Sequence, residues 1–508
     1  MPIRIEKDEP RGGHEGGGGG QRGGGGGNPI ALLMIFLAIF IKRPKLAIAL
    51  LIIGGAFYML GGGAFFGGME EMAFSKGCTL SQEMFDKAEV FEPLSTRKTK
   101  MPERVSLQDF APRRKNQGQQ GSCVGWATAY SARTILHAKA TGEDPDDVAF
   151  SPAFLYNQIA LQGCQGSYML DAMKSLKNVG AIGFNEFKYD ERSCSRKPDN
   201  QHKTTAQDYT IRGFNRLTLN HNNYKVDMEA IKQNLAQGAP VTIGMQVGGT
   251  FMELQGEKVW KPTQADYNMR GFGGHAMTVI GYDENLQGGS FQIMNSWGPY
   301  WGDKGNIWVR YKDFDYFVKE AYGLYPMGDA RTANKLAVEF GLVDNESGNN
   351  IPMERINGRE FKTTDPLQPR QKFKIEVTNQ AECYTYVFGQ ETDGSSYVLF
   401  PYTNKHSPFC GIVGTRLFPK DHSLYPDSTG TRDYMAIVVS KKQLKFDVLN
   451  DAISEAPGRR YVDKVNNALQ AVDVGLGTVN FRPGQTIGFE ADITEDKFAV
   501  GVVLEISK

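Results

Sequence analysis

Two apolar runs near the N-terminus place the strongest constraint on how this chain can fold. Residues 30–41 and 46–69 carry no charged side chain, and the basic sequence KRPK separates them. The second run is long enough to cross a bilayer, whereas the first is short for a full span. No amphipathic helix pattern nearby would bury these runs in a soluble core. We therefore expect residues 29–69 to be a retained hydrophobic membrane anchor, formed as one transmembrane helix or as a hairpin.

The basic cluster between the two runs predicts the orientation of this anchor. Lys42, Arg43 and Lys45 should stay on the cytoplasmic side of the membrane. In either topology the rest of the chain is then exported. We expect the later domains to be extracytoplasmic, on the periplasmic or cell-surface side.

The segments on either side of the anchor are expected to have little stable structure of their own. Residues 1–28 are rich in glycine and have almost nothing to bury, so we expect a disordered leader. Residues 70–100 are charged, and one short helix is plausible around residues 81–90. We interpret this second segment as a stalk or linker.

Length and charge indicate what lies beyond the anchor and exclude some classes of partner. A chain of 508 residues exceeds the size of a single hydrophobic core, so two domains are expected. Lys and Arg together number 57, as do Asp and Glu, and this neutral balance argues against nucleic-acid binding. Six cysteines are too few for a disulfide-stapled scaffold, so large cores must supply most of the stability.

The passage NQGQQGSCVGWATAYSARTIL, residues 116–136, places Cys123 at the start of a predicted helix. Glycines precede the cysteine, and apolar residues at helical spacing follow it. The N–H groups and positive dipole end of a helix N-terminus favour the thiolate, which is the nucleophilic form of cysteine. Taken alone, a cysteine on the edge of an apolar helix is more often a packed core residue than a nucleophile.

Two later passages supply partners for a nucleophilic thiol. His275 lies between a glycine pair and an apolar run in GGHAMTVIGYD, and it could take the proton of the thiol. Asn295, in MNSWGPYWGDKGNIWVRY, could hold the imidazole in the required tautomer. Each passage alone also fits a structural role, the first as a histidine beside a strand and the second as a turn after a strand.

Together the three passages, in this order, resemble the papain-like (C1-type) cysteine peptidase family over residues 101–326. The resemblance implies that Cys123 is the nucleophile, His275 the general acid/base and Asn295 the group that orients it. It also implies that Gln117 supplies the side-chain donor of the oxyanion hole and that Trp297 shields the Asn–His hydrogen bond. The implied fold is α+β, with a papain-like helical lobe and a β-barrel-like lobe.

The chain also departs from the family pattern. It has Cys-Val-Gly-Trp-Ala where the family has Cys-Trp-Ala, and Gln120 replaces a family cysteine three positions before the nucleophile. Cys164 and Cys194 stand in family-like contexts and could form a disulfide. Only about 30 residues separate the anchor from residue 101, too few for the long inhibitory propeptide of many relatives. Latency, if the enzyme has it, must be arranged in another way.

Residues 335–508 change to short β-rich runs and are expected to form a mainly β C-terminal module. Asp393-Gly394 predicts a hairpin turn, and two helical stretches are expected near residues 446–456 and 462–472. The segment resembles an uncharacterised β-rich module appended to bacterial peptidases. Cys383 and Cys410 could bridge outside the cell, whereas Cys78 has no obvious partner.

We therefore predict a membrane-anchored cysteine endopeptidase that hydrolyses peptide bonds of a peptide or protein substrate through a thioester acyl-enzyme. We expect no cofactor and no metal, because HExxH and paired CxxC motifs are absent. The C-terminal module could bind a protein partner. The alternative is a catalytically weak papain-fold protein that binds peptides or serves in assembly. A GxCxG nucleophile elbow is disfavoured because no strand precedes it.

Overall fold

The computed structural model describes residues 1–8, 76–92, 94–95, 100–220, 225–327, 332–420 and 422–508. The expected anchor at 29–69, and the leader beyond residue 8, lie outside this described part. Among the residues that are described, no helix has the length and apolar character needed to cross a membrane. The described residues belong to one compact unit.

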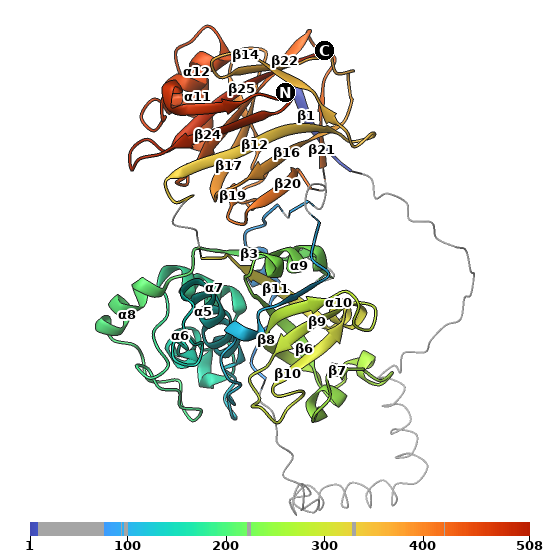
Figure 1. Ribbon diagram of the computed structural model, residues 1–508, viewed down its shortest axis with the longest axis vertical. Helices are drawn as coiled ribbons and strands as arrows, with labels where there is room; N and C mark the ends of the chain where they lie inside the picture. The colour runs from blue at the N-terminus through green and yellow to red at the C-terminus, as the bar shows by residue number, and fades with distance from the viewer. Residues whose placement is uncertain (9–75, 93, 96–99, 221–224, 328–331, 421) are drawn as a thin grey trace, which may run out of the picture. The chain divides into compact units, whose positions relative to one another are not determined.

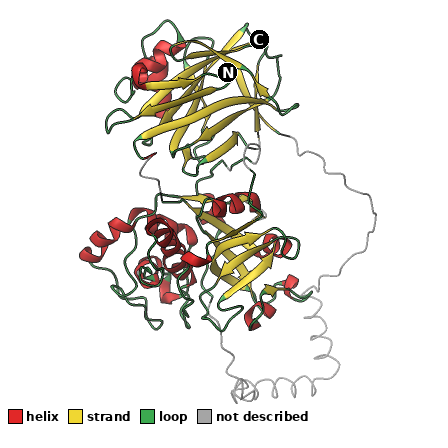
Figure 2. Ribbon diagram, in the orientation of Figure 1, coloured by secondary structure: helices red, strands yellow, loops and turns green. Residues whose placement is uncertain are grey.

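The first half of the region between residues 100 and 327 is helical (Figure 2). One continuous helix begins at Cys123 and winds more widely, as a π-helix, from Trp126 to Arg133 before it returns to α geometry. Ser151 caps the next helix by accepting the N–H of Phe154. The helices here are α4 (Cys123–Gly125), η2 (Trp126–Arg133), α5 (Thr134–Thr141), α6 (Pro152–Ile159), α7 (Met169–Asn178) and α8 (Asn200–Ala206).

The second half is built on a sheet in the order β3-β11-β6-β8-β9-β10-β7, with β2 also paired to β8 (Figure 1). Its inner strands are continuous apolar runs because both of their faces are buried. The strands are β2 (Arg104–Ser106), β3 (Phe214–Arg216), β6 (Val241–Val247), β7 (Val259–Trp260), β8 (Gly273–Asp283), β9 (Ser290–Met294), β10 (Asn306–Arg310) and β11 (Val318–Leu324). A separate pair, β4 (Thr218–Asn220) and β5 (Lys225–Val226), precedes helix α9 (Met228–Ala236), and α10 (Tyr311–Phe317) follows β10.

The C-terminal module contains two sheets whose facing side chains share one hydrophobic core. The first sheet has the order β1-β21-β16-β12-β24-β23, and the second has the order β14-β15-β25-β22-β17-β18. The first comprises β1 (Ile3–Lys7), β21 (His422–Pro426), β16 (Phe373–Asn379), β12 (Lys335–Asp344), β24 (Ile487–Asp492), β23 (Val479–Arg482), β13 (Asn350–Ile351) and β20 (Gly414–Phe418). The second comprises β14 (Met353–Asn357), β15 (Glu360–Thr363), β25 (Ala499–Ser507), β22 (Arg432–Ser440), β17 (Cys383–Gln390), β18 (Ser396–Phe400) and β19 (Phe409–Cys410).

Helices α11 (Phe446–Glu455) and α12 (Tyr461–Leu469) pack on the second sheet and form a further apolar cluster with it. Both helical stretches expected from the sequence are therefore present. The Asp393-Gly394 turn joins β17 to β18, which pair antiparallel as a hairpin. The mainly β character expected for this module agrees with the structure.

Two expectations about the N-terminal segments need correction. Residues 3–7, expected to be part of a disordered leader, form strand β1, which pairs antiparallel with β21 of the C-terminal module. Ile3 is fully buried there, so this short stretch does remove apolar surface from water when it folds. The stalk expected at 70–100 is also wrong for residues 76–92 and 94–95, which pack against the remainder of the described chain and include helix α3 (Gln82–Asp86).

Candidate active site

Cys123 is the first residue of helix α4, as the sequence predicts. Its side chain has no solvent exposure, and its Sγ accepts a hydrogen bond from the backbone N–H of Ala276 at 3.4 Å. Ala276 follows His275 in strand β8, so the helical and β halves of the catalytic region meet at this thiol. The dipole of the long helix that starts here favours the thiolate over the thiol.

The unusual Val-Gly-Trp sequence after the nucleophile has a packing reason. A Cβ added at Gly125 would lie 2.7 Å from the carbonyl oxygen of Pro152, which belongs to the backbone of helix α6. Only glycine allows this close approach of the two helices. Trp126 is then buried and makes edge contacts with the rings of Tyr130 and Tyr189. The tryptophan thus contributes to the core of the helical half.

His275 and Asn295 are joined by a hydrogen bond of 2.7 Å between Nε2 and Oδ1. Asn295 follows strand β9, which is the neighbour of β8 in the sheet, and its Oδ1 also accepts the N–H of Ser296 at 2.7 Å. Since the amide oxygen can only accept, Nε2 must carry the proton of a neutral imidazole. Nδ1 is buried and has no hydrogen-bond partner in the described part of the chain, which leaves it able to accept a proton.

Trp297 covers this hydrogen-bonded pair. Its ring stacks on the His275 ring with a centroid separation of 4.3 Å and an interplanar angle of 26°. The side chain is almost fully buried and also contacts the rings of Phe251 and Trp301. The contact agrees with the shielding position that the family resemblance implies.

Gln117 lies beside the turn that carries Asn295. Its backbone N–H donates to Ser296 O at 2.8 Å, and its Oε1 accepts from Ser296 Oγ at 2.7 Å. Its Nε2 donates to Gln120 O at 2.9 Å. Gln117, six residues before Cys123, therefore lies against the turn that carries Asn295. Hydrogen bonds to Ser296 and Gln120 hold its side-chain amide in place.

Residues 76–79 lie across the thiol, and sequence reasoning did not anticipate this. The N–H groups of Gly77 and Cys78 approach Gly274 O at 3.2 and 3.0 Å. Ser167 N–H donates to Gly77 O at 2.9 Å, and Thr79 N–H donates to Ser167 O at 3.1 Å. Cys78 and Ser167 form a parallel bridge. We call residues 76–79 the cleft segment; it explains why Cys123 and His275 are both fully buried.

Burial sets the protonation states of the catalytic pair in this covered form. Burial raises the pKa of Cys123 to about 12, against smaller lowering effects of the Ala276 and Gly77 backbone groups. Burial lowers the pKa of His275 to about 4, with a smaller lowering effect of the Lys76 charge and an opposing, raising effect of the Asn295 hydrogen bond. At neutral pH the pair is therefore an uncharged thiol and an uncharged imidazole, which is not a reactive ion pair.

The remaining cysteines fall into three groups. Cys164 and Cys194 are joined by a disulfide, the pairing that the resemblance implies. Cys383 and Cys410 are directly opposed on β17 and β19, but they are free thiols rather than the bridge we considered. Cys78 is buried in the cleft segment with its Sγ pointing toward Gly244 and Met169. Within the described ranges, no cluster of three or more His, Cys, Asp or Glu residues could hold a metal ion.

The site thus combines a thiol at a helix N-terminus, an imidazole whose Nδ1 has no hydrogen-bond partner among the described residues, and an asparagine that orients the imidazole. Thiol nucleophiles are activated by this combination of Cys, His and Asn. Residues 102–322 match the family model described as papain family cysteine protease. This part of the chain matches the papain family. The matched residues lie within the range 101–326, over which the sequence resembles that family.

Individual relatives are similar over the same region. Cathepsin K of Mus musculus is 27% identical over 195 residues, which cover 38% of this chain and 54% of the relative. Vignain of Vigna mungo is 26% identical over 197 residues, covering 38% of this chain and 49% of the relative. The chain thus spans about half the length of these curated relatives. Xylellain, a cysteine protease from Xylella fastidiosa, is a solved structure with 21% identity and a TM-score of 0.41, covering 51% of this chain and 97% of its own.

Proposed function

We propose that the protein is a cysteine endopeptidase that hydrolyses peptide bonds through a thioester acyl-enzyme. The observation that carries the proposal is the His275–Asn295 hydrogen bond beside a thiol that contacts the next residue of the same strand. This arrangement supplies a nucleophile, a base of fixed tautomer and a group that holds the base. The similarity of residues 102–322 to cysteine peptidases supports the same chemistry.

The residues act in sequence. Nδ1 of His275 takes the thiol proton, and the Cys123 thiolate attacks the carbonyl carbon of the substrate. The backbone N–H of Cys123 and the side-chain amide of Gln117 stabilise the oxyanion. The imidazolium then protonates the leaving amine, which departs as the C–N bond breaks and leaves a thioester. His275 next removes a proton from water, whose attack releases the acid product and restores the thiol.

The test is labelling by a thiol-directed peptidyl epoxide, combined with turnover of a fluorogenic peptide library. We expect the wild type to label and cleave, and Cys123→Ala to do neither. Cys383→Ala is the matched control, because it removes a buried thiol of the C-terminal module and should keep both activities. Equal labelling of wild type and Cys123→Ala would contradict the proposal.

The same data decide the alternative of a peptide-binding or assembly protein with little turnover. That alternative predicts peptide binding that Cys123→Ala leaves intact, with no cleavage of any library member. The intact hydrogen bond between His275 and Asn295 favours the peptidase. Cleavage lost in Cys123→Ala would exclude the binding-only function.

We further propose that residues 29–69 anchor the protein to a membrane and that the folded unit is extracytoplasmic. The support is the length and apolar character of the runs, the basic cluster between them, and the Cys164–Cys194 disulfide, a bond typical of oxidising compartments. Strand β1 adds a constraint, because residues 3–7 pair with the same module that follows the anchor. A single crossing would separate them, so the hairpin is the favoured topology.

Epitope tags before Met1 and after Lys508, in separate proteins, test this topology by protease digestion of spheroplasts. We expect both tags to be digested without permeabilisation. Digestion of the C-terminal tag alone would indicate a single span and would contradict the hairpin. Protection of both tags would contradict export of the folded unit.

A further inference from the structure

We propose that the C-terminal module is a clamp that keeps the peptidase latent, because it binds residues 90–95 and thereby holds the cleft segment, residues 76–79, on Cys123. This inference rests on the proposed peptidase function and concerns the regulation of the same site. It also gives the module a role, which neither its sequence nor the comparisons supply.

The first step is that the cleft segment blocks the site without serving as a substrate. The backbone N–H of Gly77 faces Cys123 Sγ, and the Gly77 carbonyl oxygen is bonded to Ser167 N–H instead. A thiolate attacks a carbonyl carbon whose oxygen lies in an oxyanion hole, and this segment presents an N–H group. The segment therefore excludes substrate and resists cleavage in this position.

The fit of the segment leaves no space for a side chain at its centre. A Cβ added at Gly77 would lie 2.0 Å from Gly121 O, and one added at Gly274 would lie 2.1 Å from Cys78 O. Both neighbours are backbone atoms and cannot move aside. The Cys78 side chain is buried beside Gly244, in the same apolar cluster as Cys123 and Met169, which anchors the segment in the wall of the site.

The second step is that the C-terminal module holds the chain that leaves the cleft. Val90 N–H donates to Lys405 O at 2.8 Å, and Ser407 N–H donates to Val90 O at 2.8 Å. Ser95 N–H donates to Thr415 O at 2.6 Å, next to an antiparallel bridge of Leu94 with Arg416. We call the described residues 90–92 and 94–95 the clamped segment. It adds strand-like pairing to the loop at residues 405–407 and to strand β20 of the module.

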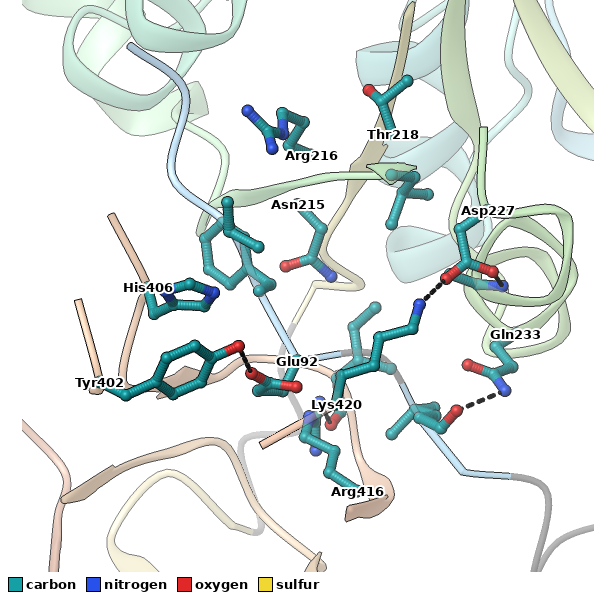
Figure 3. Close-up of a pocket in the computed structure, with 16 residues that line it drawn as sticks. Glu92, Asn215, Arg216, Thr218, Asp227, Gln233, Tyr402, His406, Arg416 and Lys420 are labelled. Carbon is teal, nitrogen blue, oxygen red and sulfur yellow. Dashed lines mark hydrogen bonds and ion pairs between the residues drawn. The ribbon is translucent and has the colours of Figure 1, made fainter. Parts of the chain in front are cut away.

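The third step is that side chains from the catalytic region and the module close around the clamped segment (Figure 3). Tyr402 Oη donates to Glu92 Oε1 at 2.9 Å, and Gln233 Nε2 donates to Leu94 O at 2.8 Å. Asp227 and Lys420 pair at 2.6 Å across the two regions. The cavity left between these groups is about 70 Å³, enough for a few waters at roughly 30 Å³ each and too small for another peptide.

The fourth step is that the cleft segment and the clamped segment are coupled. Helix α3 lies between them, and Leu80 and Met84 pack on the same apolar cluster as Cys123 while Ala88 is buried. Only ten residues, 80–89, separate the two segments, so the chain that connects them is short. Loss of the clamp's hydrogen bonds lowers the stability of the covered site, and the open fraction rises.

The experiment uses the full chain with two kinds of variant. Gly77→Val cannot occupy the cleft, and Val90→Pro lacks the N–H that bonds to Lys405 O. The matched controls are Gly477→Val, where a Cβ meets no atom, and Val90→Ala, which keeps the N–H. Each protein is measured for the rate of Cys123 labelling by the peptidyl epoxide, for turnover of a fluorogenic peptide, and for folding by circular dichroism melting.

We expect Gly77→Val and Val90→Pro to label roughly tenfold faster than wild type or more, since the rate follows the open fraction. Both controls should match wild type. Faster labelling without turnover would support the clamp and contradict the proposed peptidase activity. If Gly77→Val and Val90→Pro fold but label at the wild-type rate, the clamp proposal is wrong. If those variants also turn over the peptide as wild type does, the peptidase proposal is still supported. Ser95→Pro, which removes the bond to Thr415 O, replaces Val90→Pro if that variant does not fold.

Discussion

Asn295 determines which nitrogen of His275 is available to the thiol. Its Oδ1 accepts from Nε2 and from Ser296 N–H, so the amide cannot turn without losing two hydrogen bonds. The sequence predicted this asparagine from its position after an apolar strand in an NSWG turn. The spacing alone could not predict that Ser296 and Gln117 lock the turn from the other side, because those contacts join segments far apart in the chain.

We expect Asn295→Ala to lower kcat/KM by roughly 10²-fold, because a freely rotating imidazole is less often in the productive tautomer and orientation. KM should change little, since Asn295 orients the base and does not bind substrate. Steady-state kinetics on the fluorogenic peptide measure the effect, best in the Gly77→Val background. Asn285→Ala, at an exposed asparagine in the same lobe, is the control and should leave the rate unchanged.

The low pKa of His275 predicts that acid opens the covered site. Its pKa is about 4 when covered and returns toward the ordinary value of about 6.5 when water enters. Between these values the open form binds a proton that the covered form does not bind. The covered form is therefore fully favoured above about pH 6.5 and loses stability as the pH falls toward 4.

Hydrogen exchange at the Gly77, Cys78 and Thr79 amides measures this opening. Wild-type protection factors should fall roughly tenfold from pH 7 to pH 5. Burial raises the pKa of Glu320, near Cys78, to about 7, and this group acts in the opposite direction. The diagnostic quantity is therefore the difference from His275→Ala, in which the fall with pH should disappear. An equal fall in both proteins would assign the opening to other groups.

At the scale of elements, local sequence and tertiary packing determine different features of the helix that begins at Cys123. Its existence follows from the apolar periodicity after the nucleophile. The close approach of this helix to α6 could not be predicted from the sequence. It depends on the contact between Gly125 and the Pro152 carbonyl, which lie in different helices. The wider winding from Trp126 to Arg133 is likewise a tertiary feature.

We expect Gly125→Ala to lower the free energy of unfolding by about 1–3 kcal/mol, because the added methyl group would press on a backbone carbonyl. Urea unfolding followed by circular dichroism measures the change. Gly477→Ala, where the methyl group meets open space, should stay close to wild type. A Gly125→Ala protein as stable as wild type would show that α6 can shift at no cost.

At the scale of the whole molecule, residues from both ends of the chain form one module. The strands of residues 335–508 were predictable from their alternating and aromatic runs. Strand β1 was not predictable, because five residues beside a glycine tract are too few to show a clear alternation of apolar and polar side chains. Its partners are distant in sequence: Tyr397 Oη accepts Ile3 N–H at 2.8 Å and donates to Ile3 O at 3.1 Å. The pairing of the cleft segment with Ser167 escaped prediction for the same reason.

We expect Ile3→Ala to destabilise the C-terminal module by about 2–5 kcal/mol, the usual cost of emptying a buried isoleucine site. Thermal unfolding of the full chain should show the module's transition at lower temperature. Ile356→Ala, at a side chain that is 47% exposed, is the matched control. An unchanged transition in Ile3→Ala would mean that β1 adds no stability to the sheet.

The position of the cleft segment within the same polypeptide has a consequence for inhibitor design. A tethered ligand is present at an effective concentration of roughly millimolar, whatever the amount of protein. Under the proposed clamp, dilution of the protein therefore leaves the open fraction unchanged. A competitive inhibitor of the open site has to compete with this tethered segment. Compounds that compete for the hydrogen bonds between the clamped segment and the C-terminal module would instead change the open fraction without entering the cleft that holds Cys123.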